Sequence, residues 1–383
     1  RQRQMCIRDS LSFWIHLCYT IMCFDDPRPE MGDGNREWAA EKGNITIMAQ
    51  NDIGIDLGTT TIIIAQEGQG VVLNQPSVVA VDTRKNCVLE AGDKALAMVG
   101  RTPNYISAIF PLKDGVISDH TMTRELICRF VNQVYSSHMV KPRVAVCVPA
   151  AITGIESDAV VEAVMAAGAR QVYLIDEPIA AALGSGIDIT VPDGRMIIDI
   201  GGGTTEVAVI SLGGIVTSSS LRLAGNRLDE AIAMHLRDLL GIKIGERTAE
   251  VIKIKIGSIL PFEDGRERDM IISGQDVYTE QPKEVTIQSE DVRAALQAPI
   301  EEMVLHIKDT FKKTNPDLAS DIIQNGILLT GGGGLLSGLD RYLTDKLEIP
   351  VWVSETALTN VVSGCLKVLE TPTALKQTLM RSK

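Results

Sequence analysis

The chain is 383 residues long, with 45% hydrophobic and 22% charged residues, so it can form two domains that each have a buried core. Its 49 acidic and 37 basic residues give a formal net charge of -12, and no long stretch of Lys and Arg occurs. This balance argues against a nucleic acid as the main partner. The seven cysteines and five histidines show no spacing typical of disulfide frameworks or zinc sites, which indicates a protein of the reducing cytosol.

Residues 1–47 differ in pattern from the rest of the chain. Residues 11–24 are apolar, but the stretch is short for a membrane span, contains polar side chains and is not followed by a clear signal-peptide cleavage site. Residues 25–47 are polar and show no periodicity. We expect the natural protein to begin at Met48, and residues 1–47 to be a non-native or disordered leader. The alternative is a membrane anchor at residues 11–24.

Short apolar segments alternate with amphipathic ones from residue 52 to about residue 186. This alternation predicts parallel βα units, whose sheet is covered by helices on both faces. The predicted strands are residues 53–57, 62–65, 78–81, 143–149 and 172–175. The predicted helices are residues 122–135, 156–167 and 179–185.

The same layout starts again at residue 195, with a hairpin, a third strand near residues 215–223 and a helix at residues 228–240. Two copies of one layout predict duplicated domains, at residues 48–190 and 191–350, with a ligand cleft between them. Each copy carries an insertion that we expect to form a small subdomain. The insertions are residues 82–119 and residues 241–297, and the second is helical and then extended.

Two apolar strands run into an acidic glycine turn. The sequences are Ile-Gly-Ile-Asp-Leu-Gly-Thr-Thr-Thr at residues 53–61 and Met-Ile-Ile-Asp-Ile-Gly-Gly-Gly-Thr-Thr at residues 196–205, and a second apolar run follows each. Each sequence therefore predicts a β-hairpin. A glycine turn can point several backbone N–H groups at one spot, which suits a phosphate. Because a carboxylate would repel a phosphate, Asp56 and Asp199 are predicted to hold a hydrated Mg²⁺ between themselves and the phosphates.

Either turn alone would more often be an ordinary structural turn. A third segment supports the binding interpretation, because residues 327–330 predict a strand, Gly331 to Gly334 follow it, and residues 335–347 predict an amphipathic helix. A glycine stretch before a helix can lie flat against a planar or anionic group. These three elements, in this order, are characteristic of the superfamily of actin, sugar kinases and DnaK-type ATPases.

Within this superfamily the chain resembles the MreB/Mbl family of bacterial actin-like cell-shape proteins, over about residues 48–369. The segments that carry the resemblance are residues 52–61, 74–80, 111–117, 199–210, 244–250 and 329–339. The resemblance implies an α/β actin-like ATPase fold in which residues 351–383 return to the first domain. It also implies ATP and Mg²⁺ as cofactors, slow hydrolysis coupled to assembly, and homo-oligomeric filaments that organise cell-wall synthesis and rod shape. The protein would be cytoplasmic and peripheral at the inner face of the cell membrane, with cell-wall elongation proteins as partners.

Glu177 follows a predicted strand and opens a predicted helix. By the resemblance it matches the glutamate that orients the attacking water, and Thr204 matches the threonine beside it. The alternative for Glu177 is an acid that only stabilises a helix N-terminus. Glu250 and Lys253 lie one helical turn apart and match a pair that reaches the ribose and adenosine, the alternative being a surface salt bridge. The predicted nucleotide-binding residues are Gly58, Thr59, Thr60, Thr61, Gly201, Gly202, Gly203, Thr204, Glu250, Val251, Ile252, Lys253, Gly332, Gly333, Gly334 and Leu335.

The loop at residues 136–142 lies between a predicted helix and a predicted strand. By the resemblance, Met139 and Val140 would dip into the membrane surface beside Lys141. The alternative is a loop that packs on its own domain.

Three other functions share parts of this pattern. A small-molecule kinase of the same superfold needs an aspartate base near the γ-phosphate, whereas Glu177 suits a water better than a sugar hydroxyl. A DnaK-type chaperone needs a further peptide-binding domain after the ATPase. A nucleotide-binding scaffold without hydrolysis would not need Asp56, Glu177, Asp199 and Thr204 together.

Overall fold

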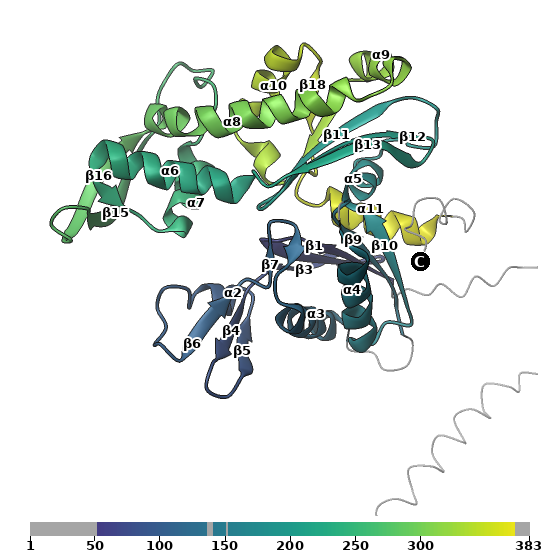
Figure 1. The fold of residues 1–383 in the computed structure, drawn as a ribbon, viewed down its shortest axis with the longest axis horizontal. Coiled ribbons are helices and arrows are strands. Elements are labelled where there is room, and N and C mark those ends of the chain that lie inside the picture. Colours follow the sequence, from purple (N-terminus) through teal and green to yellow (C-terminus); the bar gives the residue numbers. More distant parts are fainter. Residues whose placement is uncertain (1–51, 136–140, 151, 372–383) are drawn as a thin grey trace, which may run out of the picture. The chain divides into compact units, whose positions relative to one another are not determined.

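The structure is a computed structural model that describes residues 52–135, 141–150 and 152–371 (Figure 1). The predicted leader and the predicted membrane-contacting residues, Met139 and Val140, lie outside the described residues. Within the described ranges, no helix is both long enough and apolar enough to span a membrane.

The first central sheet consists, in spatial order, of β10 (Gln171–Asp176), β9 (Arg143–Val148), β1 (Ile53–Leu57), β2 (Thr61–Gln66) and β3 (Gly70–Pro76). Strands β1 and β2 pair antiparallel and form the first predicted hairpin, while β1, β9 and β10 run parallel. Side chains of a strand alternate between the two faces of its sheet. Both faces are buried here, which explains the nearly unbroken apolar runs of β1 and β9.

The second central sheet consists, in spatial order, of β13 (Gly214–Leu221), β12 (Thr205–Ser211), β11 (Arg195–Ile200), β17 (Ile327–Thr330) and β18 (Val351–Val353). Strands β11 and β12 form the second predicted hairpin, and β11, β17 and β18 run parallel. A hairpin next to two parallel strands, with a third antiparallel strand on its other side, thus occurs twice. The predicted duplicated α/β fold is confirmed.

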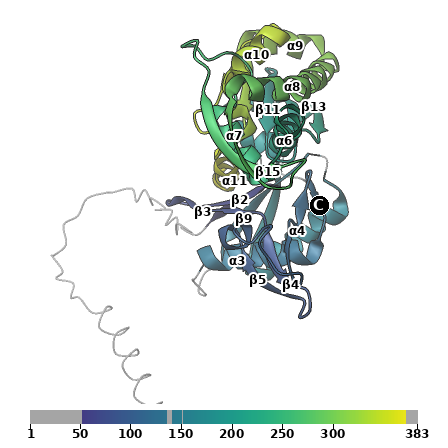
Figure 2. The same ribbon diagram turned by 90° about the vertical axis from the view of Figure 1, so that its left-hand side faces the viewer.

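Helices cover both faces of each sheet (Figures 1 and 2). The outer faces carry α3 (His120–Val134) and α4 (Gly154–Ala166) on the first sheet, and α6 (Gly225–Leu240) and α8 (Ser289–Lys312) on the second. The two facing sides share one apolar core with α5 (Glu177–Gly184) and α11 (Asn360–Glu370). Cys147 of the first sheet and Ile197 of the second both belong to this shared core. Helices α5 and α11 therefore pack between the facing sides of the two central sheets.

Smaller elements lie in and beside the predicted insertions. The first small sheet consists of β5 (Cys87–Ala91), β4 (Val79–Asp82) and β6 (Ile106–Ile109), with α2 (Asp93–Leu96) and the two-residue strands β7 (Leu112–Lys113) and β8 (Val116–Ile117) nearby. Its strand β4 begins three residues before the predicted insertion, so the predicted strand at residues 78–81 belongs to this small sheet and not to the first central sheet. The second insertion contains α7 (Glu246–Ile256) and a sheet of β14 (Ile242–Lys243), β15 (Asp269–Asp276) and β16 (Pro282–Gln288). Helix α9 (Pro316–Asn325) precedes β17.

Three details differ from the sequence-based expectations. The amphipathic run at residues 335–347 is not one helix but a 3-10 turn, η1 (Gly333–Leu335), followed by α10 (Leu339–Leu347), because Gly338 adopts a left-handed conformation that interrupts the helix. Strand β3 was not predicted, because its Asn, Gln and Pro residues weaken the apolar pattern. Strand β18 pairs with β17 in the second sheet, so the chain returns to the first sheet after Val353, later than the predicted residue 351.

Candidate functional site

A cavity of about 630 Å³ lies where the two hairpin turns meet. The predicted residues in its wall are Asp56, Gly58, Thr59, Thr60, Thr61, Glu177, Asp199, Gly201, Gly202, Thr204, Glu250, Lys253, Gly332, Gly333 and Leu335. The structure thus brings together residues that lie up to 279 positions apart in the sequence, from Asp56 to Leu335. Four predicted residues are not in the wall, namely Gly203, Val251, Ile252 and Gly334. The side chain of Ile252 instead packs in the apolar core of the second sheet.

The glycine backbone of the second turn lies directly against the threonine side chains of the first turn. A Cβ atom added at Gly202 would lie 1.8 Å from Thr60 Oγ1, and one added at Gly203 would lie 2.6 Å from Thr59 Oγ1. Both distances are shorter than any van der Waals contact, so only glycine fits at these two positions. The absent side chain at Gly202 leaves the backbone of the second turn open to the cavity beside the first turn.

Three carboxyl groups lie close together in the wall of the cavity. Asp56 and Asp199 are each the next-to-last residue of their strand, β1 and β11, and Glu177 begins α5 directly after β10. Burial raises the pKa of Asp56 to about 7. Burial, together with the negative charges of Asp56 and Glu206, raises the pKa of Asp199 to about 8. Burial and the neighbouring carboxylates, first of all Asp199, raise the pKa of Glu177 well above its ordinary value.

This part of the cavity wall is suited to a cation. Asp199 is only 2% exposed, and its Oδ2 has no hydrogen-bond partner among the residues that the structure describes. In the same part of the chain, no three His, Cys, Asp or Glu side chains form a ready cage for a metal ion. Mg²⁺ does not need such a cage, because it keeps several waters and binds through one or two carboxylates and substrate phosphates. Asp56 and Asp199 therefore fit a hydrated Mg²⁺.

The only basic side chain in the described wall of the cavity is Lys253 of α7. Its Nζ lies 2.9 Å from Asp229 Oδ1 and donates a 2.9 Å hydrogen bond to the carbonyl oxygen of Gly225. Both residues of this pair are mostly buried, so the ion pair of Lys253 is with Asp229 and is not the surface salt bridge considered as the alternative for Glu250 and Lys253. Burial raises the pKa of Asp229 to about 6 in spite of the opposing charge of Lys253.

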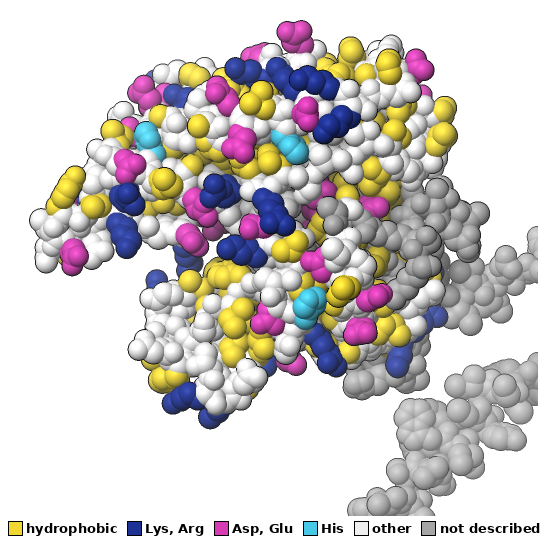
Figure 3. Space-filling model, in the orientation of Figure 1, with side chains coloured by type: hydrophobic (Ala, Val, Ile, Leu, Met, Phe, Trp, Pro, Cys, Tyr) yellow, Lys and Arg dark blue, Asp and Glu magenta, His cyan; other side chains and the backbone are white. Residues whose placement is uncertain are grey.

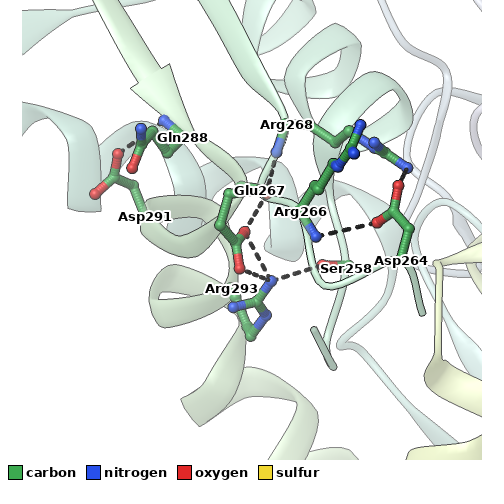
Figure 4. Close-up of polar contacts among 9 residues, drawn as sticks. Ser258, Asp264, Arg266, Glu267, Arg268, Gln288, Asp291 and Arg293 are labelled. Atoms are coloured by element: carbon green, nitrogen blue, oxygen red, sulfur yellow. Dashed lines mark hydrogen bonds and ion pairs between the residues drawn. The ribbon is translucent and has the colours of Figure 1, made fainter. Parts of the chain in front are cut away.

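The segment after α7 closes this side of the cavity. Gly257 lies in the wall, Ser258 forms a parallel β-bridge with Ser337, and the two together connect α7 to the glycine turn after β17. Figure 4 shows how the segment is fastened to α8: Arg293 Nη2 donates to both carboxylate oxygens of Glu267, each at 3.0 Å, and to Ser258 Oγ at 3.4 Å. The position of this wall thus depends on an ion pair that lies outside the cavity.

The sequence matches a known protein family over most of its length. The family described as MreB/Mbl protein matches residues 50–377. The chain belongs to the MreB/Mbl family. It is 44% identical over 318 residues to the cell shape-determining protein Mbl of Bacillus subtilis, covering 83% of this chain and 95% of the relative. It is 46% identical over 329 residues to the cell shape-determining protein MreB of Escherichia coli, covering 84% and 94%. The predicted family resemblance is confirmed.

Solved structures of MreB/Mbl relatives share the fold. MreB5 of Spiroplasma citri bound to ADP superposes with a TM-score of 0.81 at 36% identity, covering 86% of this chain and 98% of that one. The same protein bound to AMPPNP gives a TM-score of 0.78 and covers 84% and 96%. A MamK double helical filament shares the fold at 20% identity, with a TM-score of 0.71, and covers 84% and 98%. The predicted actin-like fold class is therefore confirmed.

Several residues in the wall were not predicted. They include Gly225, Asp229, Gly257, Ser337 and Leu358. The stretch around Gly225 does carry a signal, a glycine and an acid in the first turns of a long amphipathic helix, but the partner of Asp229 lies 24 residues further on. Pairings at that distance cannot be read from local patterns.

The surface gives no sign of a nucleic-acid groove on the face shown in Figure 3. Lys and Arg side chains on this face are interspersed with Asp and Glu rather than gathered in one stripe. A phosphate backbone is bound by a continuous basic patch. That nucleic acid is not a partner stays a prediction for this member of the MreB/Mbl family.

Proposed function

We propose that the chain binds ATP with Mg²⁺ in this cavity, hydrolyses it slowly, and assembles into filaments at the inner membrane face that organise cell-wall synthesis. The observation that carries the proposal is the meeting of two glycine hairpin turns, each with an aspartate beside it, at one cavity. Relatives named as cell shape-determining proteins, and a relative bound to ADP and to AMPPNP, support it. Met139 and Val140 remain the proposed membrane contacts.

Each side chain would have a distinct role in this reaction. The turn amides would bind the phosphates, and Asp56 and Asp199 would hold the hydrated Mg²⁺, which offsets phosphate charge. Glu177 begins a helix at the edge of the cavity, beside the carboxyl-terminal end of β10. With Mg²⁺ bound, the metal charge would oppose the neighbouring carboxylates that raise the pKa of Glu177, and the ionised Glu177 would orient a water and accept its proton. Thr204, on the facing turn, would position the same water.

The nucleoside would lie toward the second sheet. Lys253 and Glu250 of α7, together with the turn at Gly332 and Gly333, line that side of the cavity. Because Lys253 is already paired with Asp229, its N–H groups are held in a fixed direction. A ribose hydroxyl or a purine ring would meet a preformed wall there, which lowers the entropy lost on binding.

The test is ATP-dependent pelleting of the full chain, with and without anionic liposomes, in parallel with phosphate release. We expect the wild type to pellet only with ATP. Glu177→Ala should keep ATP-dependent assembly and lose about 10²- to 10⁴-fold in phosphate release, which is the usual contribution of a positioned acid–base group. A chain that stays monomeric with ATP on liposomes and phosphorylates a small metabolite would contradict the filament function and favour a kinase.

A further inference from the structure

Helix α11 lies behind all three carboxyl groups of the cavity, although it carries none of them. Cys365 Sγ donates to the carbonyl oxygen of Ile55, next to Asp56, over 3.6 Å. Gly364 packs against α5, whose first residue is Glu177, so closely that a Cβ there would lie 1.9 Å from the carbonyl oxygen of Ala180. The third contact of α11 is made by Asn360 and leads to Asp199.

Asn360 is the first residue of α11, and its side chain is 0% exposed. Its amide Nδ2 donates to Thr330 Oγ1 at 3.0 Å, and its Oδ1 accepts from Thr356 Oγ1 at 2.6 Å. The Thr330 hydroxyl in turn donates to the carbonyl oxygen of Ala357 at 3.1 Å. The Asn360 amide therefore both donates and accepts a hydrogen bond, and so does the Thr330 hydroxyl. These contacts fix the orientation of both side chains.

Thr330 is the register partner of Asp199, because β17 and β11 run parallel and these two residues lie opposite each other. The next residue, Gly331, has a left-handed φ of 79° and lies directly against the aspartate. A Cβ added to Gly331 would be 2.3 Å from Asp199 Oδ1 and 2.4 Å from the carbonyl oxygen of Ile200. A shift of Thr330 would thus move Gly331 into, or away from, the Asp199 carboxylate.

From these contacts we infer that Asn360 is a positioning residue: its side chain fixes the Thr330–Gly331 turn, and the turn holds the Asp199 carboxylate in the orientation that receives the metal ion. The inference rests on the proposed binding of ATP with Mg²⁺. It assigns to α11 a role in metal binding without any contact to metal or nucleotide. Partners that orient a metal ligand in this way commonly change metal affinity by about 10- to 100-fold when they are lost.

The role predicts a selective defect. Loss of the Asn360–Thr330 hydrogen bond should weaken the Mg²⁺-dependent part of ATP binding and leave metal-free ATP binding unchanged, because the turn amides and Lys253 do not depend on that hydrogen bond. A residue that only stabilised the fold would weaken both parts alike. The ratio of the two affinities therefore separates the two explanations.

The experiment measures the affinity for a fluorescent ATP analogue in EDTA and across a Mg²⁺ titration, and repeats the titration with Mn²⁺ detected by electron paramagnetic resonance. The variants are Asn360→Leu, Thr330→Val and the conservative Thr330→Ser. Thr310→Val is the matched control, because Thr310 is about as buried as Thr330 and its hydroxyl also bonds to two partners, His306 O of α8 at 3.1 Å and Ser219 Oγ of β13, all outside the cavity wall. We expect Asn360→Leu and Thr330→Val to raise the metal concentration that half-saturates ATP binding by about 10-fold or more. Thr330→Ser and Thr310→Val should match the wild type.

Equal loss of affinity with and without metal in Asn360→Leu and Thr330→Val would overturn the inference, and so would a normal metal titration in both. If Asn360→Leu does not fold, the pair Thr330→Val and Thr330→Ser decides. A wild-type chain that binds no ATP at any metal concentration would overturn the proposed function, and this inference with it. A wild type that binds Mg²⁺ and ATP, with variants that match it, would overturn only the role of Asn360.

Discussion

The two sheets contribute to the cavity alike at their hairpins and differently away from them. Each hairpin supplies an aspartate at the end of a buried strand and a glycine turn beside it. Beyond the turns, the first half adds mainly apolar side chains such as Val116 and Ile152, whereas the second adds Lys253 and the turn at Ser337. A metal-bound phosphate can be approached by equivalent groups from two sides. A nucleoside has no such symmetry, so the part of the cavity wall that would contact it can come from one half of the chain alone.

The two aspartates also differ. Asp199 is more fully buried than Asp56. Gly331 packs against its carboxylate, and the negative charge of Glu206 contributes to its raised pKa. The larger penalty for an unpaired charge at Asp199 predicts that the second hairpin dominates metal binding.

The largest expected effect is therefore that of Asp199→Asn. The substitution keeps the shape of the side chain and removes the charge, so we expect about a 100-fold or greater increase in the Mg²⁺ concentration that half-saturates ATP binding, and a smaller increase for Asp56→Asn. Metal titration of ATP binding measures both. Asp52→Asn is the control, because Asp52 is buried just before β1 but lies outside the cavity wall. Equal effects of Asp199→Asn and Asp56→Asn would show that the two hairpins contribute equally to metal binding.

A pH dependence follows from the same two carboxyl groups. Their pKa values of about 7 and about 8 lie above the ordinary value of 3.8, so the folded chain without metal keeps protons that the unfolded chain has already released. This contribution to stability is fully present below about pH 4 and is lost as the pH rises through 7 and 8. We expect the melting temperature of the nucleotide-free chain to fall from pH 6 to pH 9, and to fall less in Asp199→Asn.

Differential scanning calorimetry at several pH values tests this prediction. Asp276→Asn is the control, since the N–H of Thr279 and the Lys283 ammonium hold the pKa of Asp276 well below its usual range, and it does not titrate between pH 6 and 9. If Asp199→Asn loses as much stability as the wild type over this range, the buried carboxyl groups do not cause the pH dependence.

The sequence predicts many of the residues at the proposed phosphate-binding side of the cavity, but few of the residues that hold them in position. An aspartate followed by a glycine turn is a local pattern, so Asp56 and Asp199 are assigned to the correct hairpins by their neighbours in the chain alone. The hydrogen bonds of Asn360 to Thr330 and of Lys253 to Asp229 join residues that lie 30 and 24 positions apart in the sequence. Hydrogen bonds of this kind depend on how helices dock, which no local periodicity encodes.

The proposed nucleoside side can be probed at the buried ion pair between Lys253 and Asp229. In Asp229→Asn the ammonium of Lys253 keeps a hydrogen-bond acceptor but loses the compensating charge, and we expect a loss of about 1–3 kcal/mol in the free energy of unfolding. ATP affinity should fall alike in EDTA and in Mg²⁺, because the pair faces the nucleoside. Denaturant unfolding and nucleotide titration measure the two effects. Asp238→Asn, in an exposed pair on the same helix, should change neither.

The smallest effect is expected at the ion pair between Glu267 and Arg293, which fastens the wall from outside the cavity. The pair is partly exposed, so Glu267→Gln should cost no more than about 1 kcal/mol of stability and weaken ATP binding by about 1.5- to 5-fold. The loss should again be independent of Mg²⁺, unlike that expected for Asn360→Leu. Exchanging the two charges, with Glu267→Arg and Arg293→Glu together, should restore part of the affinity, whereas Lys313→Gln in a fully solvated pair should have no effect. A metal-dependent loss of ATP affinity in Glu267→Gln would show that the proposed nucleoside wall and the proposed metal site are coupled. The two halves of the chain would then not contribute separately to the binding of metal and nucleoside.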